Sequence, residues 1–156
     1  MTRLPILRAI GAIALVFSAL AFAACGGDDS EGLSKEDYKK QAQEISDKFE
    51  TDFQGSLKNA TSKDPQESLT GVQQIASSST ETADNLDKLE PPEEYKDVQG
   101  KLVGTLRTLG ERGDKVEQAA EDKDEAAIDA AVTSFQQGIQ DLDRVGSEFD
   151  KKVGTT

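Results

Sequence analysis

The chain has 156 residues, a formal net charge of −12, one cysteine and no histidine or tryptophan. This length fits one domain, the lone cysteine excludes an intramolecular disulfide, and the missing histidine excludes imidazole-based catalytic triads and the usual Cys/His zinc sites. The acidic balance disfavours nucleic acid as a partner, because phosphate binding requires a concentrated basic surface.

The N-terminal part has the pattern of a cleaved signal peptide. Arg3 and Arg8 precede a mostly apolar run over 9–24, which ends in small residues before Cys25. The run is shorter than the ~20 apolar residues that cross a bilayer, and acids rather than a basic cluster follow it. We therefore predict that residues 1–24 are removed. Cys25 would then carry a lipid anchor that includes palmitate and holds the protein at the outer face of the cytoplasmic membrane.

Two other interpretations of the leader stay open. Ordinary cleavage would leave the Cys25 thiol free, and a retained leader would form a transmembrane anchor. Phe22 departs from the leucine that lipoprotein processing sites usually carry, whereas Ala23 and Ala24 fit them. Lipidation is favoured because it accounts for a single unpaired cysteine in an exported protein. Residues 25–33 are then a lipidated cysteine and a flexible tether.

The segment 34–154 is predicted to be all-α. Long stretches without proline are rich in Ala, Glu, Lys, Gln, Asp and Leu, which favours helices. Apolar residues recur at steps of three and four, which places them on one face of each helix. The predicted helices cover about 34–60, 65–89, 92–121 and 124–153.

Capping residues set these boundaries. Ser34, followed by acids in the first turn, gives the first helix an N-cap close to a capping box. Asp64 is the predicted N-cap of the second helix, and Pro65 takes its first position. Pro91-Pro92 ends the second helix, because proline lacks the backbone donor and disfavours helix in the preceding residue. Gly154 ends the last helix.

Glycines in the third helix bear on its continuity and packing. Gly110 and Gly113 each cost ~1 kcal/mol relative to alanine in a helix interior. The sequence leaves open whether this helix is continuous or broken near Leu109. Gly100 and Gly104 form a Gly-x-x-x-Gly pattern among charged residues, so we expect close packing against a neighbouring helix rather than a membrane span.

Similar helix lengths and short connections predict an antiparallel up-down-up-down four-helix bundle. The Pro91-Pro92 turn would lie at the membrane end, beside the tether. The loops at 59–64 and 121–125 would lie at the opposite end, where an arriving protein partner meets them first. The oligomeric state is not indicated.

Small residues of the second helix lie at heights similar to aromatic and glycine positions of the other helices. Either the aromatic rings of the other helices fill the space beside the small residues, or the bundle encloses a pocket for a small apolar molecule. The candidate pocket lining is Phe49, Ala76, Ser79, Ala83, Gly104, Phe135 and Gly138.

Adjacent acids are the remaining candidates for chemistry. These pairs lie at predicted helix ends or in loops, where solvated carboxylates are expected. The turn at 122–125 offers oxygen ligands but lacks the spacing of an EF-hand. We therefore expect no catalytic residue, no metal site and no cofactor.

The run from Leu86 to Tyr95, with Pro91-Pro92 inside it, resembles one found in small exported lipoproteins of high-GC Gram-positive and related bacteria. In such proteins a helix ends at a Pro-Pro pair and the next begins at once. The Ala-Ala-Cys-Gly-Gly-Asp-Asp stretch around Cys25 is similar to their processing sites. The resemblance implies export, but these proteins are mostly of unknown function, so it implies no activity.

Together these observations predict a lipid-anchored helical domain with a non-catalytic binding or scaffolding role at the cell surface. The alternative is a ligand-binding lipoprotein with a mid-bundle pocket for a small apolar molecule.

Overall fold

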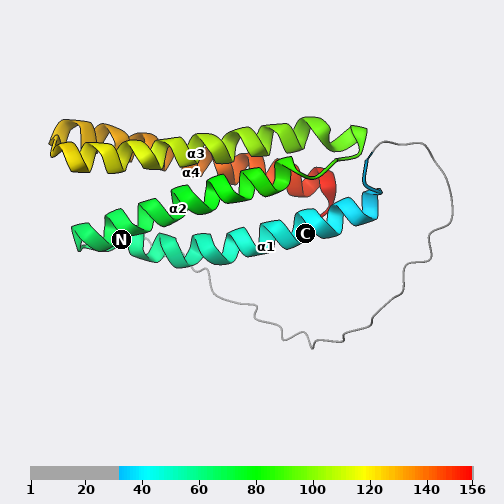
Figure 1. Cartoon of the computed structure of the whole chain (residues 1–156), viewed down its shortest axis with the longest axis horizontal. Coiled ribbons are helices and arrows are strands. Elements are labelled where there is room, and N and C mark those ends of the chain that lie inside the picture. Colours follow the sequence, from blue (N-terminus) through cyan, green and yellow to red (C-terminus); the bar gives the residue numbers. More distant parts are fainter. Residues whose placement is uncertain (1–31, 156) are drawn as a thin grey trace, which may run out of the picture. The chain divides into compact units, whose positions relative to one another are not determined.

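The structure is a computed structural model that describes residues 32–155. The predicted leader, the Cys25 anchor site and most of the predicted tether lie outside these residues. Within 32–155 the chain is helical and has no strand, which confirms the all-α class for this part (Figure 1). The helices of this part are α1 (Lys35–Ala60), α2 (Pro65–Asp87), the short 3₁₀ helix η1 (Glu93–Tyr95), α3 (Lys96–Asp122) and α4 (Glu125–Val153).

The predicted caps are present. The Ser34 hydroxyl accepts a hydrogen bond from the backbone N–H of Asp37. The Asp64 carboxylate caps α2, which begins at Pro65. Gly154 ends α4 with a φ of 76°, a left-handed conformation that a glycine adopts without strain.

Two helix ends differ from the predicted boundaries. α2 ends at Asp87 rather than at 89, and the chain after Pro92 first forms η1 rather than α-helix. The Tyr95 N–H donates to the Pro92 carbonyl at 2.8 Å, which is the i→i+3 bond of a 3₁₀ turn. At the other end of α3, Lys123 closes the helix with a φ of 55°. A lysine gives no sequence signal for this conformation, which glycine and asparagine favour.

α3 continues through its two central glycines without a break. A Cβ on Gly113 would lie 2.5 Å from Cβ of Ala76, and one on Gly110 would lie 2.4 Å from Oγ1 of Thr80. These glycines therefore let α3 approach α2 closely.

The expectation for the Gly-x-x-x-Gly pattern of α3 is wrong. A Cβ on Gly100 or Gly104 would meet nothing within 4 Å, so neither residue packs closely against another helix. Both glycines are exposed, and the glycines of α3 that pack closely are Gly110 and Gly113, further along the helix.

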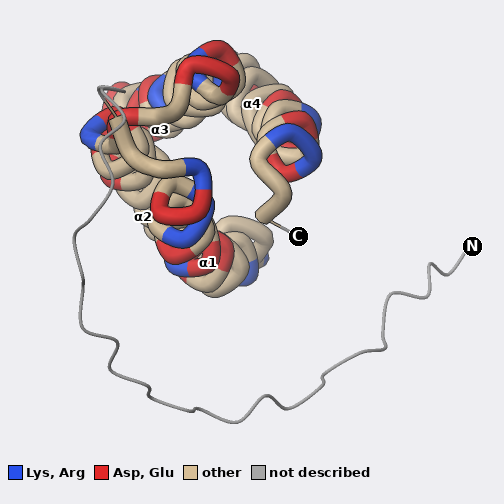
Figure 2. Tube along the Cα trace, turned by 90° about the vertical axis from the view of Figure 1, so that its right-hand side faces the viewer, with Lys and Arg blue, Asp and Glu red and all other residues tan. Residues whose placement is uncertain are grey.

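Each long helix packs against the next one in the chain: α1 against α2, α2 against α3, and α3 against α4. Contact between α1 and α4 is sparse by comparison. Seen end-on, the helices follow one another in this order and leave α1 and α4 apart (Figure 2). The most deeply buried apolar side chains come from all four of these helices; the largest are Tyr38, Ile75, Leu86, Leu106, Leu109, Phe149 and Val153.

A buried polar network joins α1, α2 and α3 at one end of the core. The Tyr38 hydroxyl donates to Oε1 of Gln99 at 2.7 Å, and Nε2 of Gln99 donates to the backbone carbonyls of Leu86 and Leu89. The Tyr38 ring stacks on Tyr95 with ring centroids 5.4 Å apart. Buried polar groups that all have partners favour one packing register over others.

Burial raises the pKa of Tyr38 above its ordinary value of 10.0. The native state therefore keeps this proton at a pH where the unfolded chain has lost it, and stability falls as the pH rises above about 10. We expect the free energy of unfolding to fall less steeply in that range in Tyr38→Phe, which cannot ionise. Urea unfolding at a series of pH values would measure both slopes. Equal slopes in the two proteins would show that ionisation of Tyr38 does not cause the loss of stability, because the other tyrosine of the domain, Tyr95, is present in both.

Candidate functional site

The apolar stripe of α1 is covered at one end only. Tyr38 and Ala42 are fully buried, whereas the later stripe residues are partly exposed. These partly exposed residues are Ile45, Phe49, Phe53 and Leu57. The rings of Phe49 and Phe53 contact each other at a centroid distance of 5.5 Å. The sparse contact with α4 explains why this half of the stripe remains accessible.

The apolar stripe of α4 is likewise buried at one end and partly exposed at the other. Its C-terminal half is buried, with Phe149 and Val153 at 1% and 0% exposure. Its N-terminal half is partly exposed at Ile128, Val132 and Ile139. The core is therefore closed where α1 begins and α4 ends, and it opens toward the ends joined by the α1–α2 and α3–α4 loops. Figure 1 shows the α1–α2 pair and the α3–α4 pair separating toward those loops.

A cavity of about 360 Å³ lies between the middle of α1 and the C-terminal half of α4. Phe49 and Phe53 line it from α1, and Leu142 and Gly146 line it from α4. Buried leucines of α2 and α3, including Leu106, form its base.

A second cavity, of about 560 Å³, continues toward the loops. Leu57 and Leu69 line it from α1 and α2, Val116 from α3, and Ile128 and Phe135 from α4. Ile139 lines both cavities, so they adjoin. We call the two together the α1–α4 groove. Each volume falls within the ~300–1,000 Å³ range of ligand pockets, and their lining is mainly apolar.

Carboxylates border the cavity of about 360 Å³, which we call the middle cavity. Glu50 lies on the α1 side, and Asp143 and Asp150 lie on the α4 side. Asp150 accepts a hydrogen bond from Oγ1 of Thr155. Neither Glu50 nor Asp143 forms a salt bridge within residues 32–155, so both negative charges face solvent without a cation beside them.

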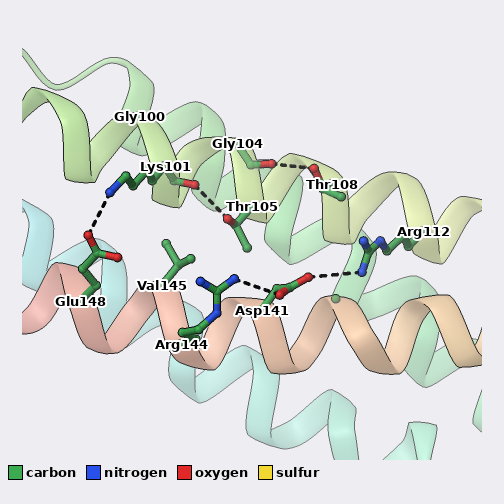
Figure 3. A pocket seen from close by; sticks show the side chains of 11 residues that line it. Gly100, Lys101, Gly104, Thr105, Thr108, Arg112, Asp141, Arg144, Val145 and Glu148 are labelled. Atoms are coloured by element: carbon green, nitrogen blue, oxygen red, sulfur yellow. Dashed lines mark hydrogen bonds and ion pairs between the residues drawn. The ribbon is translucent and has the colours of Figure 1, made fainter.

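A polar depression of about 530 Å³ lies on the outer side of α3 and α4 (Figure 3). Its charged side chains are already paired. Lys101 bonds Glu148 at 3.0 Å and Arg144 bonds Asp141 at 3.1 Å. Arg112 lies 3.8 Å from Asp141 and donates to the Ser134 carbonyl. Each charged side chain of the depression therefore has an oppositely charged partner, and none of them is an isolated charge.

The seven residues predicted to line one pocket lie in different places. Phe49 lines the middle cavity of the groove, and Phe135 lines the cavity nearer the loops. Gly104 and Gly138 line the outer depression instead.

The three α2 residues of this prediction are core residues that line neither part of the groove. Ala76 contacts Gly113 of α3, Ala83 is fully buried, and the buried Ser79 hydroxyl donates to the Ile75 carbonyl at 2.7 Å. Their positions in the sequence place these residues at similar heights but do not show which way each helix is turned.

The groove and its border are not recognisable from the sequence. Phe53, Leu57 and Ile139 follow the apolar periodicity of their helices, but periodicity shows which residues share a face and not whether another helix lies on it. Glu50 and Asp143 gave no signal, since single exposed acids are common on helices.

In the described part of the chain, no helix is both long and apolar enough to cross a bilayer. Within the same residues, no group of three or more Asp, Glu, His or Cys side chains could hold a metal ion. The class that the fold and groove define is an all-helical domain with an accessible apolar groove.

The chain belongs to the DUF7018 family, a domain of unknown function, whose model matches residues 32–143. No similar protein was found among curated proteins, and no similar structure among solved ones.

Proposed function

We propose that the protein is a lipid-anchored, non-catalytic binding module at the outer face of the cytoplasmic membrane, and that the α1–α4 groove is its binding surface. The single observation that supports the binding role is the accessible apolar stripe of Phe49, Phe53, Leu57 and Ile139. Contiguous apolar surface exposed on a soluble domain commonly marks an interaction site. The leader and Cys25 support the anchor.

The proposed arrangement of the helices within 35–153 is an antiparallel up-down-up-down bundle with an open fourth seam. Packing of consecutive helices and their short connections support it. Contacts at one end support it further. Lys35 bonds Glu94 at 3.0 Å, and the Leu33 N–H donates to the Glu90 carbonyl at 3.0 Å. The tether would thus leave beside the Pro91-Pro92 turn, and the groove would open away from the membrane.

A second candidate function is binding of a small apolar molecule. The cavity of about 560 Å³ nearer the loops favours it, because Phe135 and Val116 give it an apolar lining. Its ligand would be held between the ends of the two helix pairs.

The anchor has a direct test. We expect the wild-type protein to incorporate labelled palmitate in its bacterial host and to partition into the membrane fraction. Cys25→Ser removes the sulfur that the first acyl chains need, so it should lose the label. Labelling that persists in Cys25→Ser, or an unlabelled wild-type protein recovered from the medium, would overturn the anchor.

The binding role has its own test, in which Gly146 and Gly55 form a matched pair. Both are helical glycines at which a Cβ meets nothing within 4 Å, but only Gly146 lines the groove. Gly146→Leu should fill the groove, whereas Gly55→Leu adds the same side chain elsewhere. Native membranes would be solubilised, and captured proteins and small molecules identified by mass spectrometry. A component lost from Gly146→Leu and kept by Gly55→Leu supports the groove; identical captures contradict it.

A further inference from the structure

We propose that the occupant of the α1–α4 groove is a basic amphipathic helix of a partner protein. This inference rests on the proposed binding function and names the chemistry of the partner. It follows from the shape of the groove, from the two unpaired carboxylates on its border, and from the poor fit of the other candidate occupants.

The shape of the groove suits a helix. Lining residues on α4 run from Glu125 to Asp150, which corresponds to ~37 Å of helix at ~1.5 Å per residue. The groove lies between two helices of the bundle and has an apolar base. An amphipathic helix docks in such a groove through apolar residues at i, i+3, i+4 and i+7. The bound helix would complete the cover that α1 and α4 do not give each other.

The charged side chains that line the middle cavity are all negative, whereas the cavity nearer the loops has Lys123 and Glu125, so the middle cavity specifies a positively charged partner. Glu50 and Asp143 lie on opposite sides of the middle cavity and have no cationic partner within residues 32–155. Lysine or arginine beside the apolar stripe of the incoming helix would pair with both. Complementary border charges speed association and select the partner. The net charge of −12 acts in the same direction over a longer range.

Two other occupants fit less well. A second copy of this chain would bring its own Glu50 and Asp143 to the same groove, and like charges brought together oppose that contact. An anionic lipid would cover the apolar base, but its head group would meet the same two carboxylates. An acidic helix is disfavoured for the same reason.

The test uses the chain expressed from residues 1–156 and reconstituted in phosphatidylcholine nanodiscs, with empty nanodiscs as the reference. The probe is a fluorescent peptide of about five helical turns, built from leucine and lysine with its leucines on one face and a photoreactive leucine among them. Comparison peptides are a scrambled one of equal composition and one in which glutamate replaces lysine. A fluorescent fatty acid is the fourth probe.

Two pairs of variants distinguish binding in the groove from a general attraction to the negative charge of the protein. Glu50→Gln with Asp143→Asn removes the border charges, and Glu111→Gln with Asp114→Asn removes the same number of charges from the exposed side of α3. Gly146→Leu fills the groove, and Gly55→Leu is its control. Circular dichroism and thermal melting verify that each variant is folded.

We expect the leucine–lysine peptide to bind the wild type and to crosslink to α1 and α4. Affinity should fall at least about tenfold in the border pair and in Gly146→Leu, and stay within about twofold in both controls. Equal losses in the border and α3 pairs, or equal binding of the scrambled or glutamate peptide, overturn the inference. If only the fatty acid binds, and Gly146→Leu abolishes that binding, the groove function survives and the helix partner fails. If no probe is sensitive to Gly146→Leu, both fail.

Discussion

Replacing Tyr38 by alanine should lower the free energy of unfolding by about 3–5 kcal/mol, the usual cost of deleting a buried ring. The ring is fully buried and stacks on Tyr95, and its hydroxyl is the hydrogen-bond partner of Oε1 of Gln99. The substitution therefore leaves a cavity and an unpaired amide oxygen at the closed end of the core. Small domains are stable by only about 5–15 kcal/mol, so much of the stability would be lost.

Chemical denaturation of Tyr38→Ala, Tyr38→Phe and the wild type would separate the two contributions. Tyr38→Phe keeps the ring and loses only the hydrogen bond to Gln99, so we expect a loss of about 1–3 kcal/mol. Should both variants unfold at the same denaturant concentration as the wild type, the closed end would not hold the helices together as described. Loss of the ring should therefore cost more than loss of the hydroxyl.

Gly71→Ala should destabilise the protein by about 1–3 kcal/mol, although alanine is the better helix former. A Cβ on Gly71 would lie 2.1 Å from the backbone nitrogen of Ala60 and 2.6 Å from its Cα. These are backbone atoms of the last residue of α1, so relief requires α1 to move away from α2.

Gly55→Ala supplies the control for the same exchange. A Cβ there meets nothing within 4 Å, so only the helix propensity changes, and stability should rise by about 0.5–1 kcal/mol. Thermal melting of both variants would show whether Gly71→Ala lowers the stability and Gly55→Ala raises it. A stabilised Gly71→Ala would contradict the close approach of α1 and α2 at this position.

Much of the local structure could be predicted from the sequence because it depends on neighbours in the chain. Ser34, Asp64 and Gly154 act as caps through bonds or backbone angles within a few residues of themselves. Asp124, near which the sequence placed the start of the last helix, likewise caps α4 through the N–H of Ala127.

Features that depend on how two helices meet could not be predicted. Gly110 and Gly104 carry the same local signal, yet Gly110 contacts α2 and Gly104 faces open space. The rotation of α3 about its axis decides between them, and periodicity fixes that rotation only to within the width of an apolar stripe.

The candidate site could likewise be predicted only in part. Phe49 and Phe53 lie on the apolar face of α1, as their spacing of four residues indicates, but half of that face stays accessible. The stripe of α4 looks complete in the sequence from Ile128 to Val153, and its coverage changes along its length. An uncovered stripe and a covered one have the same pattern, so the groove became visible only in the packed structure.

The most direct test of the central claim is photocrosslinking from position 53 in living cells. Phe53 would be replaced by p-benzoylphenylalanine, which keeps an aromatic ring in the groove and reacts with whatever lies against it. We expect a crosslinked adduct to a molecule other than this chain, which is lost when Gly146→Leu is added and retained with Gly55→Leu. The absence of any adduct, or an adduct equally abundant with both leucine substitutions, would contradict a binding groove between α1 and α4.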